Sequence, residues 1–341
     1  MNMNANMLEQ TELTPARKLL LFFKQRLVAP GAEGFDLFDD ADADALAALI
    51  KRNRLEALMH TLPGLDDTMP LGSDAAERYR GESFRRMLFG NHQISQGVAF
   101  AAALADAGVP CLCMRGPYTS LDLYGDPGIR PYNDLDLLVP RKQAMAAWQV
   151  ACDLGYELFT PGMPVRYFLR HHLHWQLRQP KQNVICDLHW AVEHPYRLYK
   201  IDYDAIFAAA QTVRCEGRTW HEPAPIHHVL LTAIHLRKHV DELWRWSKQP
   251  SGLEALVARG ELLHLLDLAL LVQRHGAKLD WDALSETAVT WNACEALAGS
   301  LALMQEAFAL EIPAGWLGAL EAAIPDWQRA LPADSAAKIA S

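Results

Sequence analysis

The sequence contains few cysteines and no long apolar run. Only 6 cysteines occur in 341 residues, and none are spaced as C-x-x-C, which argues against a zinc knuckle or a dithiol redox site. The amino-terminal segment has no basic-then-apolar signal pattern, so reduced, mostly buried thiols and a cytoplasmic location are expected. No apolar run reaches the roughly 18 residues that a membrane span requires, so none is expected.

Basic residues are outnumbered by acidic ones. The chain has 32 Lys and Arg against 41 Asp and Glu, a formal net charge of -9. Nucleic acid and anionic membranes both repel such a chain at long range, which makes them poor default partners. Apolar residues make up 50% of the sequence, which is enough for a large core and excludes an intrinsically disordered chain.

Hydrophobic periodicity divides the chain into a helical region, an α+β unit, a second helical region and a tail. The predicted boundaries are 1–107, 108–215, 216–332 and 333–341. The residue ranges with helical spacing are 16–27, 43–59, 75–107, 142–154, 226–246, 253–275, 281–290 and 293–310. Adjacent amphipathic helices in the last region pack most economically as a bundle.

Short apolar runs of strand length are confined to the middle unit. They are 111–114, 135–139, 156–159, 173–177 and 184–190. A polar connector of hairpin length joins the last two, which predicts antiparallel pairing between them. The predicted fold class is therefore α+β, with a small mixed or antiparallel sheet flanked by N-terminal helices and a C-terminal helical bundle.

Two aspartates separated by one residue carry the most informative signal. Asp134 and Asp136 project from one face of a predicted strand, while Leu135, Leu137 and Val139 face the core. Adjacent carboxylates repel each other unless a cation or a proton lies between them. Hard oxygen ligands of this kind suit Mg²⁺, which usually takes one or two carboxylates together with substrate phosphates.

A third carboxylate lies on another predicted strand. Asp187 is embedded in the apolar run 184–190, where an unpaired charge would be costly. Three carboxylates from two neighbouring strands would form a divalent-cation site suited to nucleotidyl transfer. In that site, Asp187 would serve as a metal ligand or as the general base.

The order of these motifs resembles that of the polymerase-β-type nucleotidyltransferase superfamily. A glycine after a strand, D-x-D on the next strand and a lone aspartate on a later strand form its signature. More narrowly, RG…LYGD…RPYNDLDLLVP…LGYEL…HHLHW…VICDLHW is similar to the uncharacterised bacterial nucleotidyltransferase family. The resemblance is densest over residues 111–192, and a weaker one continues in the C-terminal helices.

The resemblance implies a catalytic site and a reaction. Asp134, Asp136 and Asp187 would hold Mg²⁺ or Mn²⁺, and a nucleoside triphosphate, expected to be ATP, would donate its nucleoside monophosphate to an acceptor hydroxyl with release of pyrophosphate. The acceptor is unknown, with a peptide or protein, a sugar or a small molecule favoured over RNA. In an alternative interpretation, the fold is kept without catalysis, as a nucleotide-binding or partner-binding protein such as an antitoxin-like subunit.

The resemblance also implies phosphate-binding residues. Gly116 would let the loop after the first strand approach the triphosphate, and Arg115 and Arg130 would contact phosphate oxygens. A structural ion pair with the same aspartates is the alternative for both arginines. The family's usual Gly-Ser is Gly-Pro in this sequence, so Thr119, Ser120 or backbone amides would replace the missing serine hydroxyl.

Histidines gather near the hairpin and in the following helix. His235 and His239 have the i, i+4 spacing of a metal-binding pair, but no third ligand and no following glutamate are evident. Packing in the core or along a cleft is the alternative. We expect His189, His235, Lys238 and His239 to line the nucleotide cleft.

Overall fold

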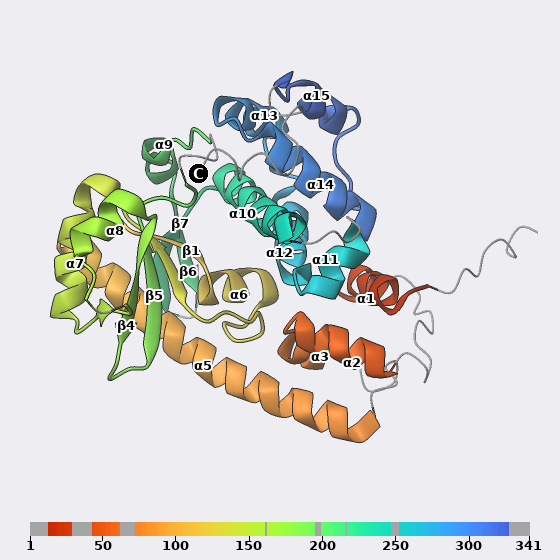
Figure 1. The fold of residues 1–341 in the computed structure, drawn as a ribbon, viewed down its shortest axis with the longest axis horizontal. Coiled ribbons are helices and arrows are strands. Elements are labelled where there is room, and N and C mark those ends of the chain that lie inside the picture. Colours follow the sequence, from red (N-terminus) through yellow and green to blue (C-terminus); the bar gives the residue numbers. More distant parts are fainter. Residues whose placement is uncertain are drawn as a thin grey trace, which may run out of the picture.

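The computed structural model shows helices in the N-terminal and C-terminal regions and strands between these regions (Figure 1). It describes residues 13–28, 43–61, 72–160, 162–194, 199–215, 217–246 and 252–326. The predicted α+β class is confirmed within these residues, and the predicted tail, 333–341, lies outside them. Among the described helices, none combines the length and the apolar composition needed to cross a bilayer.

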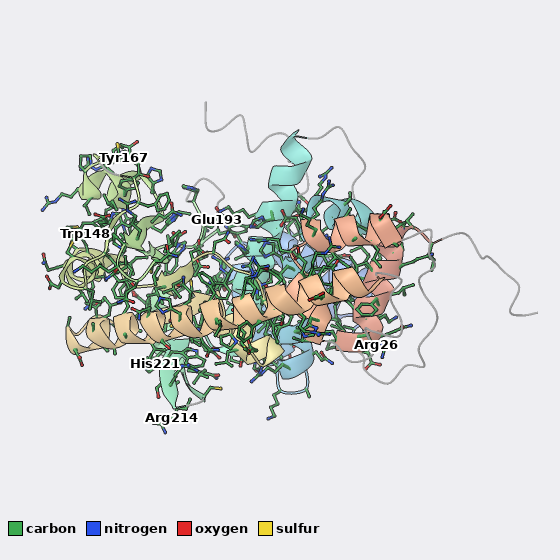
Figure 2. All side chains as sticks on the ribbon, turned by 90° about the horizontal axis from the view of Figure 1, so that it is seen from below. Arg26, Trp148, Tyr167, Glu193, Arg214 and His221 are labelled. Carbon is green, nitrogen blue, oxygen red and sulfur yellow. The ribbon has the colours of Figure 1, made fainter. Side chains whose placement is uncertain are left out.

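The N-terminal helices differ from the prediction at one turn. They are α1 (Pro15–Phe23), the π-helical segment Lys24–Val28, α2 (Ala43–Arg52), α3 (Glu56–Thr61) and α5 (Gly72–Asp106). The expected single helix over 43–59 is two helices, because Arg54 adopts a left-handed conformation with φ 57° that breaks the α-helical ladder. Figure 2 shows α5 running across the molecule, past the sheet at one end and the other N-terminal helices at the other.

The sheet is mixed, and its order is β1-β2-β5-β4-β3. Its strands are β1 (Leu112–Arg115), β2 (Leu135–Leu138), β3 (Glu157–Leu158), β4 (His174–Gln179) and β5 (Val184–His189). The predicted hairpin is confirmed, since β4 pairs with β5 in the antiparallel sense. β2 pairs with β5 in the parallel sense and with β1 in the antiparallel sense, which places β2 between them.

Three helices accompany this sheet, and only one was expected. α7 (Ala144–Asp153) lies within the predicted range 142–154, whereas α6 (Pro117–Tyr124) and α8 (Val165–His171) were not predicted. The chain then forms α9 (Tyr203–Ala208) and a separate hairpin of β6 (Gln211–Cys215) and β7 (Arg218–Glu222). The sequence analysis missed these three elements as well.

The C-terminal helices follow the prediction closely, with one break. They are α10 (Pro225–Trp246), α11 (Leu253–Arg259), α12 (Leu262–His275), α13 (Trp281–Thr290), α14 (Cys294–Phe308) and the unpredicted α15 (Trp316–Ala322). The expected helix over 253–275 is divided because Gly260 ends α11 in a left-handed conformation with φ 94°. Glycine adopts that conformation without the steric cost that other residues incur.

Two hydrophobic cores organise the described residues. One holds the side chains of the sheet together with those of α5 and α7, including Phe100, Ala147 and Trp175. The other joins α1 and α2 to the C-terminal helices, so Leu19 shares a core with Leu297. The six cysteines are free thiols and most of them are buried, as the sequence predicts.

A buried asparagine connects the α2–α3 turn to the C-terminal helices by hydrogen bonds. The Asn53 side chain is fully buried, and its amide nitrogen donates to the Val257 carbonyl at 2.8 Å. Its amide oxygen accepts from the Leu262 backbone N–H at 3.0 Å. Because buried polar groups are costly unless they are paired, these bonds fix the turn against α11 and α12, and so fix the position of Arg54.

Candidate active site

The register of β2 and β5 brings two of the predicted carboxylates together. Asp136 and Asp187 are direct partners across this parallel pair, and Asp134 immediately precedes β2. All three line one cavity of about 340 Å³. The side chains of Leu135 and Leu137 are fully buried on the opposite, core side, as the period of a strand requires.

Asp136 is held by two cationic or hydrogen-bonding side chains. Its Oδ1 lies 2.9 Å from Nε2 of His189, and its Oδ2 lies 3.4 Å from Nε of Arg115. Burial alone would raise the pKa of Asp136, but Arg115 and His189 outweigh it and hold this pKa well below its ordinary value. Asp136 is therefore ionised at neutral pH.

The hydrogen bond of the other ring nitrogen of His189 determines which nitrogen of this ring carries a proton. Its Nδ1 lies 3.1 Å from the carbonyl oxygen of Ala191, which can only accept, so Nδ1 carries a proton. Nε2 then donates to Asp136 when the ring is protonated and offers a lone pair to a cation when the ring is neutral.

Asp187 has an unsatisfied oxygen in this cavity. Its Oδ1 is buried without a hydrogen-bond partner, and its Oδ2 lies 3.4 Å from Nε2 of His174. Burial raises the pKa of Asp187 to about 7; His189 opposes this rise, and the charge of Asp136 adds to it. A buried carboxylate oxygen without a hydrogen-bond partner costs free energy. Asp187 therefore fits a site in which this oxygen binds a cation or accepts a proton.

These side chains can hold a metal ion in two combinations. Asp134, Asp136 and Asp187 offer hard oxygen ligands, which Mg²⁺ prefers. Burial, followed by the charge of Asp136, raises the pKa of Asp134, which is the expected consequence of crowding carboxylates without an ion. His174, Asp187 and His189 also present ligand atoms that lie within 4.8 Å of one another, a mixed nitrogen and oxygen set.

The loop after β1 passes close to the carboxylates. Gly116 adopts φ 79° and lines the cavity, and α6 begins at the next residue. A Cβ at Gly116 would lie 2.8 Å from the carbonyl oxygen of Asp134, closer than real Cβ atoms come. Both the positive φ and this close approach require glycine.

Replacing Gly116 by alanine is expected to displace Asp134 as well as to strain the loop. The strained backbone alone costs about 1–3 kcal/mol, and the contact with Asp134 adds to that. Gly108→Ala is the matched control, because Gly108 also has a positive φ of 72° but nothing lies within 4 Å of its added Cβ. Thermal unfolding and Mn²⁺ titration measure the stability and the ion affinity of both variants. Equal losses in the two variants would contradict the inferred contact with Asp134.

The two hydroxyls considered as replacements for the missing serine lie outside the cavity. Thr119 and Ser120 are buried and are not among the residues that line it. The Ser120 hydroxyl donates to the Asp126 carbonyl at 2.5 Å and accepts from the Arg130 backbone N–H at 3.0 Å. Thr119 lies 3.5 Å from the Met114 carbonyl. Both hydroxyls are thus engaged by the backbone of the loop, and we propose no phosphate contact for them.

The two predicted arginines have different partners. Arg115 forms the expected alternative, an ion pair with Asp136. Arg130 lines the cavity, but its guanidinium is paired with Asp267 of α12 at 2.7–2.9 Å. Both side chains of this second pair are only 5% exposed. Arg130 is therefore engaged with a helix of the C-terminal region and not with the aspartates of β2.

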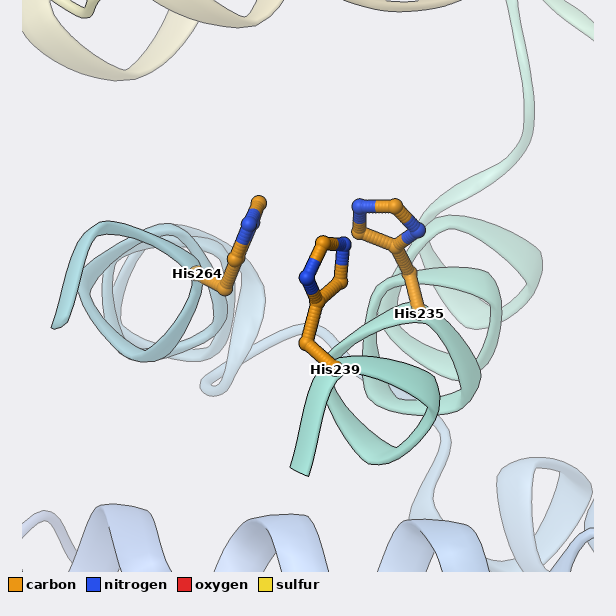
Figure 3. Close-up of side chains that lie close together, drawn as sticks. All are labelled: His235, His239 and His264. Carbon is orange, nitrogen blue, oxygen red and sulfur yellow. The ribbon is translucent and has the colours of Figure 1, made fainter. Parts of the chain in front are cut away.

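The far wall of the cavity is formed by α10, α12 and the α2–α3 turn. The predicted residues His235, Lys238 and His239 line it from α10. Figure 3 shows the ring of His264, which comes from α12, beside the rings of the two α10 histidines. Arg54 reaches the same cavity from the N-terminal helices, so all three regions of the chain contribute to it.

A family model described as "Uncharacterised nucleotidyltransferase" matches residues 39–309. The chain belongs to this nucleotidyltransferase family. The matched range begins ahead of α2 and ends just after α14, so it contains every residue that lines the carboxylate cavity. No curated protein matches the sequence. Membership supports nucleotidyl transfer in general terms and leaves the nucleotide, the ion and the acceptor to be assigned from the site.

Several lining residues of this nucleotidyltransferase were missed in the sequence analysis. They are Arg54, His174 and His264. A signal was available for His174, which alternates with the buried Trp175 along β4 and therefore shares a face with the cavity. Arg54 and His264 carry no local signal, because helix packing between distant segments brings them to the site.

Proposed function

We propose that the protein transfers a nucleoside monophosphate from a nucleoside triphosphate, ATP in the first instance, to an acceptor hydroxyl in a Mg²⁺-dependent reaction that releases pyrophosphate. The observation that carries the proposal is the pairing of Asp136 with Asp187 across β2 and β5. Asp134 lies beside this pair, and the cavity that holds all three also presents basic side chains.

The residues present fit a hard divalent cation. Asp187 Oδ1 is a buried oxygen without a partner, and Asp136 is ionised and faces it across the sheet. Asp134, Asp136 and Asp187 would hold Mg²⁺ or Mn²⁺. When bound, such an ion supplies charge stabilisation to the phosphoryl group and acidifies the attacking hydroxyl.

The chain's own side chains have separable tasks in the reaction. Arg54, Arg115 and Lys238 place positive charge along the cavity, where triphosphate oxygens replace Asp136 as the partner of Arg115. In the alternative to its role as a metal ligand, Asp187 accepts the hydrogen bond of the acceptor hydroxyl and takes its proton as the hydroxyl oxygen bonds to the α-phosphorus. The bond from the α-phosphorus to the bridging oxygen breaks, and pyrophosphate leaves with that oxygen.

Replacing Arg54 by alanine is expected to weaken triphosphate binding about tenfold or more. A hydrogen bond to a charged group contributes about 1.5–3 kcal/mol, and 1.4 kcal/mol corresponds to about a factor of ten. Titration calorimetry with a non-hydrolysable ATP analogue and Mg²⁺ measures the change without an acceptor.

Arg85→Ala serves as the control for Arg54→Ala. Its side chain is 74% exposed and pairs with Glu82 on the surface of α5, so the same charge is removed away from the cavity. If both variants bind the analogue as tightly as the wild type, Arg54 does not contact the triphosphate.

A transfer assay tests the proposed function directly. The protein is incubated with Mg²⁺ and each of the four labelled triphosphates, in turn with peptides, sugars, small hydroxylated molecules and RNA. We expect Mg²⁺-dependent release of pyrophosphate and a labelled acceptor in at least one combination. Tight triphosphate binding without pyrophosphate release on any acceptor class would instead favour a nucleotide-binding protein that uses the same fold.

A further inference from the structure

Three histidine rings meet between α10 and α12. His235 and His239 are one turn apart on α10, and His264 reaches them from α12 (Figure 3). The ring centroids are separated by 4.6 Å between His235 and His239, 4.9 Å between His235 and His264, and 4.4 Å between His239 and His264. Each ring offers a nitrogen, and these ligand atoms lie within 4.8 Å of one another.

We propose that His235, His239 and His264 bind a transition-metal dication, Zn²⁺, at a site distinct from the carboxylates. Three imidazoles with an i, i+4 pair on one helix form a typical zinc ligand set. Imidazole nitrogens suit Zn²⁺, whereas Mg²⁺ prefers carboxylate and phosphate oxygens. The wall formed by α10 and α12 therefore selects a different ion from the one held at β2 and β5.

A carboxylate on α12's amino-terminal flank supports this assignment. Glu261 Oε2 lies 3.3 Å from Nδ1 of His239 and 3.4 Å from Nε2 of His264. Histidines that bind metal usually direct their other ring nitrogen to a carboxylate, which fixes the tautomer and the orientation of the ring. Glu261 contacts one ring nitrogen in each of two of the three histidines.

Two of the three rings lie in surroundings that disfavour a positive charge. Burial lowers the pKa of His235 well below its ordinary value, and the positive charge of Arg115 adds to this shift. Burial also lowers the pKa of His264, with His239 as the next contributor. Burial therefore favours the neutral form of both rings, which is the form of histidine that binds a metal ion.

The three histidines line the same cavity as the carboxylates. All three histidines line the cavity that contains Asp136 and Asp187, so a zinc ion with three protein ligands would have its fourth position on that side. In catalytic zinc sites this position holds water or a substrate atom. Here it would take water or an anionic oxygen of the substrate, which extends the proposed function from one type of metal ion to two.

The test titrates the full-length, metal-stripped protein with Zn²⁺, and in a parallel experiment with Co²⁺. We expect one tightly bound Zn²⁺ per chain by calorimetry, and visible d–d absorption of the Co²⁺ form. His264→Gln and His239→Gln should each weaken Zn²⁺ binding at least tenfold and remove the Co²⁺ absorption. Glu261→Gln should weaken binding by about 10–100-fold.

Two controls identify the ligands. His171→Gln removes an exposed histidine of α8 and should leave both signals unchanged. His174→Gln removes a member of the neighbouring His174, Asp187 and His189 group and shows whether the measured Zn²⁺ is held by that group instead. Circular dichroism checks that each variant is folded. If either His264→Gln or His239→Gln does not fold, the other variant still measures the contribution of a histidine ligand to Zn²⁺ binding.

Three outcomes would overturn the proposal. The wild type could bind no Zn²⁺ at micromolar concentration, in which case the rings only pack against one another. Zn²⁺ binding could survive in both His264→Gln and His239→Gln, or it could be lost in His174→Gln and kept in His264→Gln. Because Zn²⁺ binding is measured without nucleotide or Mg²⁺, its failure leaves the proposed transfer reaction untouched.

Discussion

Replacing Asp136 by asparagine is expected to abolish nucleotidyl transfer while the protein stays folded. The substitution removes the ionised carboxylate that faces Asp187 across β2 and β5 and keeps the shape of the side chain. Metal ions contribute several kcal/mol to stabilisation of the transition state, and about 4 kcal/mol corresponds to roughly a thousandfold in rate. Pyrophosphate release measures the rate, and titration with Mn²⁺ measures the loss of the ion.

Asp153→Asn is the matched control for Asp136→Asn. Asp153 is exposed at the end of α7, where its carboxylate accepts from Gln149, so the same chemical change is made far from the cavity. Its rate and its Mn²⁺ affinity should equal those of the wild type. A rate for Asp136→Asn within about tenfold of the wild type would show that the carboxylates of β2 are not the catalytic ion site.

The carboxylate site was predictable from the sequence because its signals are local. The alternation around Asp136 fixes which face of the strand it occupies, and the short polar connector between β4 and β5 fixes their antiparallel pairing. Asp187 could be assigned to the same site because an ionised residue in an apolar strand needs a partner. These inferences use residues that are neighbours along the chain or across a hairpin, whereas the parallel pairing of β2 with β5, which joins Asp136 to Asp187, has no such local signal.

The opposite wall of the cavity was not predictable from local patterns. In the sequence, His264 is one of many residues in an amphipathic helical pattern. Its contact with His235 depends on how α10 and α12 pack against each other. Arg54 depends on Asn53, which joins the α2–α3 turn to Val257 and Leu262. Hydrophobic periodicity gives no information on such contacts, because they depend on the packing of different helices, and those of Asn53 join segments 204 and 209 residues apart.

Short elements were missed for a different reason. Half of the ten residues of β6 and β7 are exposed, and only Trp220 is buried. Their weak alternation of apolar and polar residues gives little strand signal. The helix α6 follows Gly116 directly, and its eight residues are too few to establish a helical period.

Replacing Asp267 by asparagine is expected to destabilise the protein by about 3–5 kcal/mol, the usual cost of leaving a buried charge without its partner. The Asp267 carboxylate forms an ion pair with the Arg130 guanidinium at 2.7 Å and accepts a hydrogen bond from the Tyr124 hydroxyl at 2.9 Å. Burial would lower the pKa of Arg130, but Asp267 outweighs it and raises this pKa, so Asp267→Asn leaves the buried guanidinium without the carboxylate that stabilises its charged form. Urea denaturation measures the loss of unfolding free energy.

A double substitution separates the charge from the packing. Arg130→Met with Asp267→Leu removes both charges, and replacing a buried ion pair by apolar residues of similar volume is often neutral or stabilising. We therefore expect the double variant to recover most of the stability lost in Asp267→Asn. The exposed pair of Arg178 and Glu157 provides the control, since Glu157→Gln should cost less than about 1 kcal/mol.

The same variants test whether Arg130 also serves the substrate. Its guanidinium lines the cavity while it is bound to Asp267, and a group held in this way supports the cavity wall where α12 meets the loop before β2. If the folded double variant binds the ATP analogue as the wild type does, Arg130 acts only through the structure. An affinity loss of tenfold or more, with the stability recovered, would assign Arg130 to the phosphates as the family resemblance implies.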